Sequence, residues 1–433
     1  MEIKDLYQIY LQHPVVTTDS RDCPDGSLFF ALKGESFDGN KFAQMALEKG
    51  CAYAVIDEAE FAQAGNERLI LVDDSLRTLQ ALANYHRRRL GTPIVGITGT
   101  NGKTTTKELI SIVLKMKYNV LYTQGNFNNH IGVPKTLLGL TSQHEMAVVE
   151  MGANHPGEID ALVHISEPDY GIITNVGKAH LEGFGSFEGV IRTKGELYDF
   201  LRSRLNSKVF LHADNPHLCR IVQGLDVEKY GSKEENGCSV YGEIVECAPY
   251  LTFRWKQAKG EWHIVQTHLI GSYNIDNMLA AATIGLYFGV TPAQIDEALT
   301  GYIPQNNRSQ LEKTEKNQLI IDAYNANPTS MMAALKNFRE MKVEHKFALL
   351  GDMRELGIGS QEEHQKIVDY IKECQFEQVW LVGQEFSKTN NSYRQFENVD
   401  QVIAAVQNED VQGYNILVKG SNGIKLSKVV EWL

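Results

Sequence analysis

The sequence lacks several features that would each assign it to a broad class of proteins. No apolar run approaches the ~18 residues that a membrane-spanning helix needs, so no membrane span is predicted. The cysteines form no C-x-x-C pair, which argues against a zinc site or a disulfide framework and favours buried reduced thiols. The six are Cys23, Cys51, Cys219, Cys238, Cys247 and Cys374.

Basic residues are also scarce. Lys plus Arg total 42 against 54 Asp plus Glu, which gives a formal charge of −12 and a pI near 5.6. This balance argues against a general nucleic-acid surface, so phosphates would have to be held locally. The opening segment MEIKDLYQIYLQHP has no basic stretch followed by an apolar run and a small-residue cleavage site, and a cytoplasmic location is therefore expected.

The 433 residues, 43% of them hydrophobic and 22% charged, are typical of a globular protein with about three domains. Two segments rich in turn residues mark candidate linkers, Gly91-Thr92-Pro93 and GYIPQNNRSQ around Pro304. We therefore expect domains at residues 1–88, 89–303 and 304–433. The first contains short strand and helix patterns and is predicted to be a small mixed α/β domain.

From Pro93 onward, apolar strand patterns alternate with amphipathic helix patterns. Such alternation predicts a doubly wound, mainly parallel sheet with helices on both faces. Residues 238–270 instead favour antiparallel strands, and residues 275–288 an Ala-rich helix. Beyond the second linker the alternation resumes and closes with a final helix, which predicts a smaller Rossmann-like α/β domain.

The segment GITGTNGKTTTKE, residues 96–108, lies between a predicted strand and a predicted helix, as a phosphate-binding loop requires. Glycines let the backbone approach phosphates, Lys103 neutralises their charge and Thr104 can bind magnesium. Ile97 stands where the usual pattern has its first glycine, so a turn that binds nothing is the alternative. The predicted nucleotide-binding residues here are Thr100, Asn101, Gly102, Lys103, Thr104 and Thr105.

Glu150 follows the predicted strand MAVVEM, at the sheet edge where ligands of open α/β sheets collect. A carboxylate there could hold the magnesium ion that bridges two phosphates. Without its surrounding sequence, Glu150 could equally be a helix-capping residue or a member of a salt bridge.

Several longer motifs resemble the Mur ligase family. They are TGTNGKTT (98–105), GNFNNHIGVPKTLL (125–138), EMGANHPGEI (150–159), NVGKAHLEGFGS (175–186) and DAYNANPTSM (322–331). The resemblance extends over nearly the whole chain in the family's order: a uridine-binding domain, a P-loop ATPase domain, and a third domain that closes over both. It implies an ATP-dependent amide-bond ligase that uses ATP and two Mg²⁺ ions.

The resemblance also implies catalytic and metal-binding roles. The implied catalytic residues are Lys103, Glu150, His180, Lys194 and Arg308, and the implied magnesium ligands are Thr104, Glu150, His180 and Lys194. For Lys194, within IRTKGELYDF, the family motif implies a lysine carbamylated by carbon dioxide, which would provide an anionic ligand for the second metal. The alternatives are a purely structural role for His180 and a solvated position on a helix for Lys194.

For the nucleotide, GSYNIDNMLAAA (271–282) resembles a family segment in which Asn274 and Asn277 approach the adenine. Tyr273 replaces the family's histidine, and the alternative role for Asn274 is to cap the following helix. The resemblance places Arg308 near the γ-phosphate, where a guanidinium suits developing charge, and Asp322 near the ribose.

The remaining motif matches imply substrate-binding residues. In TTDSRDCPDGSLFFALKGESFDGNKF (17–42) and the later motifs these are Ser20, Arg21, Lys33, Gly34, Asn128, Asn129, Asn325, Asn327, Lys419 and Ser421. The last two belong to LVKGSNG, where Asn422 replaces a frequent family arginine, so the role of Asn422 stays open.

The implied substrates are UDP-N-acetylmuramoyl-tripeptide and D-alanyl-D-alanine, joined through an acyl phosphate by a monomeric enzyme. The alternatives are a different Mur ligase, such as the one that adds the third residue, folylpolyglutamate synthase, and a non-catalytic relative that binds a nucleotide or a UDP-sugar. The EMGANHPGEI and YNANP motifs disfavour the first. Residues 1–88 disfavour folylpolyglutamate synthase. A non-catalytic relative is disfavoured by the joint presence of Lys103, Thr104, Glu150, His180 and Lys194.

Overall fold

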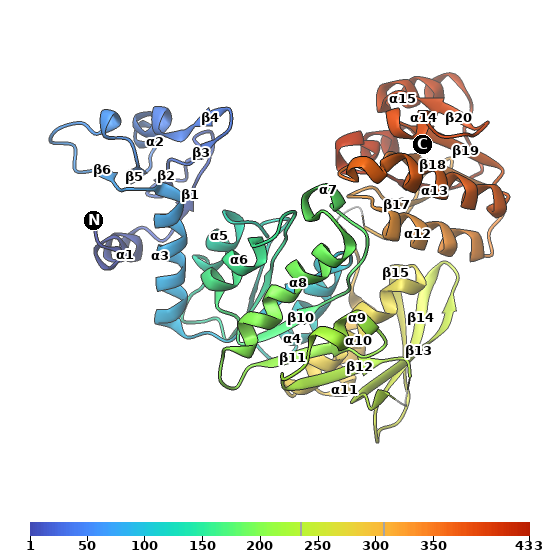
Figure 1. Ribbon diagram of the computed structural model, residues 1–433, viewed down its shortest axis with the longest axis horizontal. Helices are drawn as coiled ribbons and strands as arrows, with labels where there is room; N and C mark the ends of the chain where they lie inside the picture. The colour runs from blue at the N-terminus through green and yellow to red at the C-terminus, as the bar shows by residue number, and fades with distance from the viewer. Residues whose placement is uncertain (234–235, 306–307) are drawn as a thin grey trace.

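The computed structural model describes residues 1–233, 236–305 and 308–433 (Figure 1). Its described strands form three larger sheets that follow one another along the chain, and a two-stranded hairpin. Helices accompany each larger sheet, so the protein is α/β throughout, as the alternating sequence pattern predicts. The domain limits expected at residues 88 and 303 stay predictions.

The first sheet has the order β1-β2-β5-β6 and is parallel throughout. Its strands are β1 (Val16–Thr17), β2 (Leu28–Phe30), β5 (Tyr53–Ile56) and β6 (Leu69–Leu71), and the hairpin strands are β3 (Lys33–Gly34) and β4 (Phe37–Asp38). The run LFF of β2 is fully buried because helices cover both faces of the sheet. Those helices are α1 (Ile3–Gln12), α2 (Ala43–Glu48) and α3 (Ser75–Leu90).

Helix α3 connects the first sheet to the second (Figure 1). It begins where the Asp74 side chain accepts a hydrogen bond from the Arg77 N–H at 2.8 Å, and it ends at Gly91, whose φ of 68° stops a helix. Buried His86 contacts the carbonyl of Leu140 at 2.9 Å through Nε2. The helix thus packs against α1 of the first unit and also against α5 and α6 of the second.

The second sheet has the order β15-β14-β13-β12-β11-β10-β7-β9-β8. Its strands are β7 (Ile94–Thr98), β8 (Val120–Tyr122), β9 (Met146–Glu150), β10 (Tyr170–Ile173), β11 (Lys208–His212), β12 (Val227–Gly231), β13 (Val240–Cys247), β14 (Tyr250–Gln257) and β15 (His263–Ile270). Pairing is parallel from β8 to β13, and β13, β14 and β15 pair antiparallel. Both the parallel centre and the antiparallel edge match the sequence-based expectation.

Helices cover both faces of this sheet because its central strands are apolar on both sides. Ile94 of β7 packs into one core with α5, α6 and α8, whereas Val95 and Ile97 pack into the other with α4, α10 and α11. The helices are α4 (Lys103–Lys115), α5 (Gly132–Leu137), α6 (Glu158–Ser166), α7 (Leu181–Phe184), α8 (Phe187–Arg202), α9 (Pro216–Ile221), α10 (Ile275–Tyr287) and α11 (Pro292–Gly301).

The third sheet has the order β16-β17-β21-β18-β19-β20 and is parallel except for β16. Its strands are β16 (Gln310–Lys313), β17 (Gln318–Asp322), β18 (Lys346–Gly351), β19 (Gln378–Val382), β20 (Arg394–Phe396) and β21 (Asn415–Lys419). Helices α12 (Pro328–Glu340), α13 (Ser360–Cys374) and α14 (Gln384–Ser387) pack on one side and α15 (Val399–Asn408) on the other.

The final helix expected from the sequence is a pair of 3-10 helices, η6 (Asn422–Ile424) and η7 (Leu426–Trp432). Lys425 lies between them with φ 61°, a left-handed conformation that an α-helix cannot contain. In the described part of the chain, no helix combines the length and the apolar character needed to cross a membrane.

Candidate active site

A glycine-bounded turn connects β7 to α4. Gly99 and Gly102 have φ values of 143° and 77°, which side chains rarely adopt. A Cβ on Gly99 would lie 2.1 Å from Thr174 Oγ1, and one on Gly102 would lie 2.8 Å from Asn277 Oδ1. The turn therefore requires glycine at both positions. It presents the N-terminus of α4, where backbone N–H groups attract anions.

The segment after β10 supports this turn. The N–H of Thr100 donates to the Asn175 carbonyl at 2.9 Å, and the N–H of Asn101 donates to Asn175 Oδ1 at 3.0 Å. The N–H of Gly177 donates to Thr100 Oγ1 at 3.0 Å. Asn175 thus holds the phosphate-binding turn in place. The sequence contains it in the NVGKAH motif, which is the signal that could have assigned it a role.

Lys103 lies at the first position of α4, and its side chain folds back over the turn. Its Nζ donates to the carbonyls of Gly99 and Thr100 at 2.9 and 3.0 Å. Burial lowers the pKa of Lys103 to about 8, although Glu150 opposes this shift. A bound phosphate would restore the full positive charge of the amine by pairing with it.

Thr104 and Glu150 meet across the carboxyl ends of neighbouring strands. Thr104 Oγ1 donates to Glu150 Oε1 at 3.2 Å, and Asn128 Nδ2 donates to the same oxygen at 2.8 Å. Glu150 Oε2 is buried without a hydrogen-bond partner among the described residues. An unpartnered carboxylate oxygen beside a hydroxyl fits a magnesium ion, which takes few protein ligands together with phosphate oxygens and waters.

His180 and Lys194 both lie near enough to Lys103 for its positive charge to act on them. Lys194 is 2% exposed, its Nζ donates to the Ala153 carbonyl at 3.2 Å, and it lies 5.1 Å from the centre of the Phe184 ring. Burial, with the positive charge of Lys103 nearby, holds the pKa of Lys194 well below its usual range. His180 contacts Glu355 of the third unit through Nδ1, and burial lowers the pKa of its ring.

His180 and Lys194 do not form a cation site without a further anionic ligand. Within the described ranges, no three His, Cys, Asp or Glu side chains gather where they could hold a metal ion. A second cation beside His180 would need another anionic ligand, which an unmodified lysine cannot supply. The expected roles of His180 and Lys194 as metal ligands stay predictions.

The amides expected near the adenine contact each other. Asn277 Nδ2 donates to Asn274 Oδ1 at 2.8 Å, and Asn277 Oδ1 accepts from Thr106 Oγ1 at 2.9 Å. Asn274 occupies the N-cap position of α10 but makes no capping hydrogen bond with its side chain, so the capping alternative is wrong. Tyr273, in place of the family's histidine, makes a 2.9 Å hydrogen bond to Ser309 Oγ.

Arg308 and Asp322 come from the third unit. The Arg308 guanidinium stacks 3.7 Å from the centre of the Tyr324 ring, and within residues 1–233, 236–305 and 308–433 its buried Nε has no hydrogen-bond partner. Asp322 Oδ2 accepts a hydrogen bond from Lys419 Nζ at 2.5 Å, so two residues given separate roles from the sequence form an ion pair. The sequence offered no signal for Tyr324 beyond its place in the YNAN motif.

Asn327 joins the second and third units. Its Nδ2 donates to Asn101 Oδ1 at 2.7 Å, and its Oδ1 accepts from the Ser330 N–H at 2.9 Å, which caps α12. Asn325 accepts at Oδ1 from its neighbour's N–H at 2.9 Å. Ser421 donates to the Ala326 carbonyl at 3.2 Å and so supports the Asn325–Asn327 segment from behind.

Most of the predicted residues line one cavity of about 600 Å³ between the second and third units, a volume suited to a small-molecule ligand. Those in its wall are Thr100, Asn101, Gly102, Lys103, Thr104, Thr105, Asn128, Asn129, Glu150, His180, Asn274, Asn277, Arg308, Asp322, Asn325, Asn327 and Lys419. Residues that the sequence did not single out also line it, among them Asn154, Asn175, Asp276, Tyr324 and Thr329. Lys194 and Ser421 lie outside the wall.

The four candidates in the first unit lie apart from this cavity. Arg21 is paired with Asp19 at 2.7 Å, and Lys33 is paired with Asp57 at 3.1 Å and with Glu58 at 2.8 Å. The Arg21–Asp19 pair is exposed and constrains its side chains only weakly, whereas the Asp57 side chain that contacts Lys33 is only 12% exposed. Gly34 is exposed in the β3–β4 hairpin, whereas Ser20 is buried and its carbonyl accepts from Lys49 Nζ at 2.8 Å.

Comparison with known proteins assigns the class. Three family models match in chain order: the Mur ligase family catalytic domain over residues 14–87, the Mur ligase middle domain over 97–285, and the Mur ligase glutamate ligase domain over 307–422. The chain belongs to the Mur ligase family, whose members are ATP-dependent peptide ligases.

Particular relatives share one named activity. The UDP-N-acetylmuramoyl-tripeptide–D-alanyl-D-alanine ligase of Bacillus subtilis is 34% identical, with 96% of this chain and 92% of that protein covered. A crystal structure of MurF from Acinetobacter baumannii superposes with a TM-score of 0.85 at 29% identity, covering 96% and 92% of the two chains. MurF ligase from Thermotoga maritima in complex with ADP also has a TM-score of 0.85, at 25% identity and 96% coverage of each chain.

Proposed function

We propose that this chain joins D-alanyl-D-alanine to UDP-N-acetylmuramoyl-tripeptide and converts ATP to ADP and phosphate as it does so. The observation that carries the proposal is the 34% identity over nearly the full length to a ligase of that name. The cavity supports it, because Lys103, Glu150 and Arg308 converge there from two units of the chain.

The proposed reaction has two steps. The tripeptide carboxylate attacks the γ-phosphorus of ATP, ADP leaves, and an acyl phosphate forms. The amine of D-alanyl-D-alanine then attacks the acyl carbon, and the tetrahedral intermediate loses phosphate and a proton to give the pentapeptide. Water must be kept out because it would hydrolyse the acyl phosphate, which is a reason to place the site between two closing units.

The chain's own residues supply most of the charge stabilisation in this scheme. Lys103 would leave the Gly99 and Thr100 carbonyls and pair with the β- and γ-phosphates, beside the N-terminus of α4. Arg308, with its buried unpartnered Nε, would stabilise charge on the transferring phosphoryl group. We assign Asn274 and Asn277 to the adenine and Asp322 to the ribose.

Two magnesium ions belong to this proposal. Thr104 and Glu150 would hold the first, which when bound would neutralise phosphate charge. His180 and a carbamylated Lys194 would hold the second. The low pKa of Lys194 supports the modification, because a neutral amine can react with carbon dioxide. Native mass spectrometry of protein kept in bicarbonate would detect the added mass of carbon dioxide, and its absence there would contradict the modification.

The first unit would bind the UDP part of UDP-N-acetylmuramoyl-tripeptide through Ser20, Arg21, Lys33 and Gly34. The exposed partner of Arg21 could be exchanged for a pyrophosphate at little cost in free energy. We assign Asn128, Asn129, Asn325, Asn327, Lys419 and Ser421 to the tripeptide and the incoming dipeptide. We further propose a cytoplasmic monomer with domains at 1–88, 89–303 and 304–433.

Phosphate release by the purified chain tests the function. We expect release from ATP only when UDP-N-acetylmuramoyl-tripeptide and D-alanyl-D-alanine are both present, and tripeptides ending in lysine and in diaminopimelate would be compared. Release with the UDP-linked dipeptide and a free third amino acid would indicate a different Mur ligase. ATP binding without release in every mixture would indicate a non-catalytic relative.

A further inference from the structure

The loop that follows β18 in the third unit is held at three successive backbone N–H groups. The N–H of Asp352 donates to the Val382 carbonyl at 2.9 Å, that of Met353 to His364 Nε2 at 3.0 Å, and that of Arg354 to Ser421 Oγ at 2.9 Å. Each acceptor belongs to a different segment of the unit. The loop therefore has little freedom to change its path.

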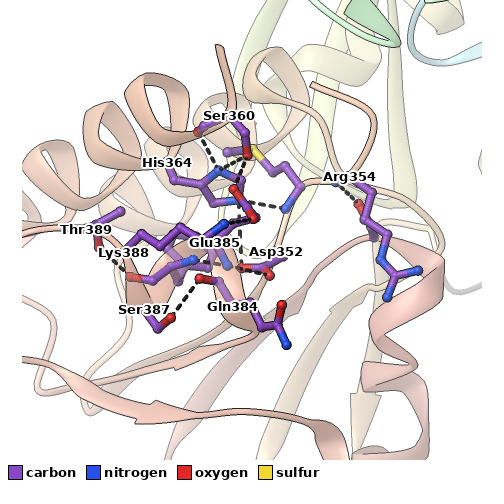
Figure 2. A network of polar contacts seen from close by, with 12 residues as sticks. Asp352, Arg354, Ser360, His364, Gln384, Glu385, Ser387, Lys388 and Thr389 are labelled. Atoms are coloured by element: carbon purple, nitrogen blue, oxygen red, sulfur yellow. Dashed lines mark hydrogen bonds and ion pairs between the residues drawn. The ribbon is translucent and has the colours of Figure 1, made fainter. Parts of the chain in front are cut away.

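Side chains beneath the loop reinforce it (Figure 2). The Asp352 carboxylate accepts from the N–H groups of Glu385 and Phe386, both at 2.9 Å. His364 is fully buried and donates through Nδ1 to the Ser360 carbonyl at 2.7 Å, which leaves Nε2 free to accept from Met353. Ser360 in turn donates to Glu385 at 2.7 Å. Asp352 and His364 thus lock the base of the loop to α13 and α14.

The anchored loop presents Glu355 to the second unit. Glu355 contacts Nδ1 of His180, and its carbonyl accepts from the Glu182 N–H at 3.3 Å. His180 and Glu355 both have left-handed backbones, with φ of 49° and 64°. Non-glycine residues keep that conformation only where their surroundings enforce it, and such strain gathers at functional sites.

The contact determines which ring nitrogen of His180 is free. A carboxylate can only accept, so Nδ1 carries the proton and donates it to Glu355. Nε2 then keeps its lone pair, and His180 lies in the wall of the cavity, which Glu158 and Asn154 also line. A histidine that binds a metal through one nitrogen usually donates its other N–H to a carboxylate or carbonyl, which sets its tautomer and its orientation.

We propose that Glu355 is a positioning residue for His180, supplied by the third unit, so that docking of this unit prepares His180 to bind the second cation. The inference rests on the proposed function, because it takes His180 as a ligand. The inference adds a physical reason why cation binding depends on docking of the third unit. Without that unit, the His180 imidazole loses the carboxylate that selects its tautomer. The cation site would then be complete only while the two units are in contact.

A matched pair of variants separates positioning from docking. Glu355→Ala removes the carboxylate that contacts His180. Glu363→Ala removes a different carboxylate from the same interface, one that pairs with Lys178 at 2.9 Å and does not touch His180. Glu355→Gln keeps an acceptor oxygen for the Nδ1 proton. Binding of Mn²⁺ in the presence of ADP, followed by electron paramagnetic resonance, measures each cation without any turnover.

We expect the wild type to bind two Mn²⁺ ions, and Glu355→Ala to weaken only one of them, by ~10- to 100-fold, the usual effect of losing such an outer partner. Glu363→Ala should leave both affinities near wild type, and Glu355→Gln should restore most of the loss. Equal weakening by both alanine variants would overturn the proposal, as would an unchanged Glu355→Ala or a wild type that binds a single ion. Failure of dipeptide-dependent phosphate release would instead count against the proposed function.

Discussion

At the scale of single residues, the cavity is built from polar groups whose partners are incomplete. In the described part of the chain, Lys103 hydrogen bonds only to carbonyls of the turn before it, and Glu150 Oε2 and Arg308 Nε are buried without a hydrogen-bond partner. Buried polar groups in folded proteins are otherwise almost always satisfied. A ligand that carries phosphates and cations would complete these groups.

Lys103→Ala tests the phosphate-binding role. We expect kcat to fall at least ~10²-fold, since a charged donor to the transferring group is lost. The fold should persist, because Lys103 hydrogen bonds only to the turn that precedes it in the described structure. Lys115→Ala, near the end of the same helix, is the control and should retain activity. Circular dichroism with phosphate release checks both, and an unfolded Lys103→Ala protein would contradict this account.

His364 gives the third unit a pH-dependent stability. Burial lowers the pKa of His364, so the native state resists protonation below the unfolded pKa of ~6.5. The stabilisation is therefore complete above pH ~6.5 and is lost as pH falls, by at most about 1.4 kcal/mol per pH unit. Thermal unfolding midpoints from pH 7.5 to 5.5 measure this loss.

The matched variant is His364→Gln, which offers a non-titrating acceptor to the Met353 N–H. Its midpoint should fall less steeply with acid than that of the wild type. His86, whose pKa burial also lowers, remains in both proteins and sets a common background. Identical slopes for the two proteins would show that His364 does not titrate as described.

At the scale of elements, the site depends on where strands stop. β7 and β9 pair in register from Ile94 with Ala147 to Ile97 with Glu150, and β10 pairs with β7 up to Thr98. Carboxyl ends of parallel strands thus align at one edge, and the turn after β7 carries the phosphate-binding residues to it. The two positive-φ glycines shape that turn, so the element is sensitive to a single methyl group.

Gly102→Ala and Gly91→Ala form a comparison at this scale. Both glycines have φ near 70°, where a Cβ costs about 1 to 2 kcal/mol. A Cβ on Gly91 meets no atom within 4 Å, whereas one on Gly102 would press on Asn277. We expect both variants to lower the thermal midpoint, and only Gly102→Ala to weaken ADP binding. Calorimetric titration with ADP decides, and an equal ADP affinity in the two variants would contradict the argument.

At the scale of the whole molecule, the second and third units meet through apolar contacts, with Ile270 of β15 packed into a core of the third unit, and through polar contacts around the cavity. Asn101 contacts Asn327, Lys178 pairs with Glu363, and the Lys178 N–H donates to Thr329 at 3.2 Å. Such contacts can break and re-form when ligands enter and leave. They suit a site that must open for three substrates and close for chemistry.

Asn327 variants separate this interface from helix stability. Asn327→Ser keeps a side chain that can cap α12 but is too short to reach Asn101, whereas Asn327→Ala loses the cap as well, at about 1 kcal/mol. We expect both to raise the KM for ATP several-fold, and only the alanine variant to lower the thermal midpoint. An unchanged KM in both would show that the Asn101 contact does not aid closure.

Much of the fold could be predicted from local patterns. The alternation of apolar strands and amphipathic helices predicted the parallel centre of the second sheet and its antiparallel edge, and the GTNGK segment predicted the turn before Lys103. The closing helix was harder, because whether a short apolar segment forms an α- or a 3-10 helix depends on the left-handed Lys425. Long-range packing sets that conformation.

The sequence by itself determined the order of elements, the phosphate-binding turn and membership of the Mur ligase family, since these depend on periodicity, glycine positions and contiguous motifs. Only the tertiary structure decided that Asp322 pairs with Lys419, that Arg308 stacks on Tyr324, and that Glu355 meets His180. His180 and Glu355 are 175 positions apart. The first two contacts form within the third unit, where β17 lies beside β21, and the last forms where the second and third units meet. No local pattern in the chain encodes contacts between segments so far apart.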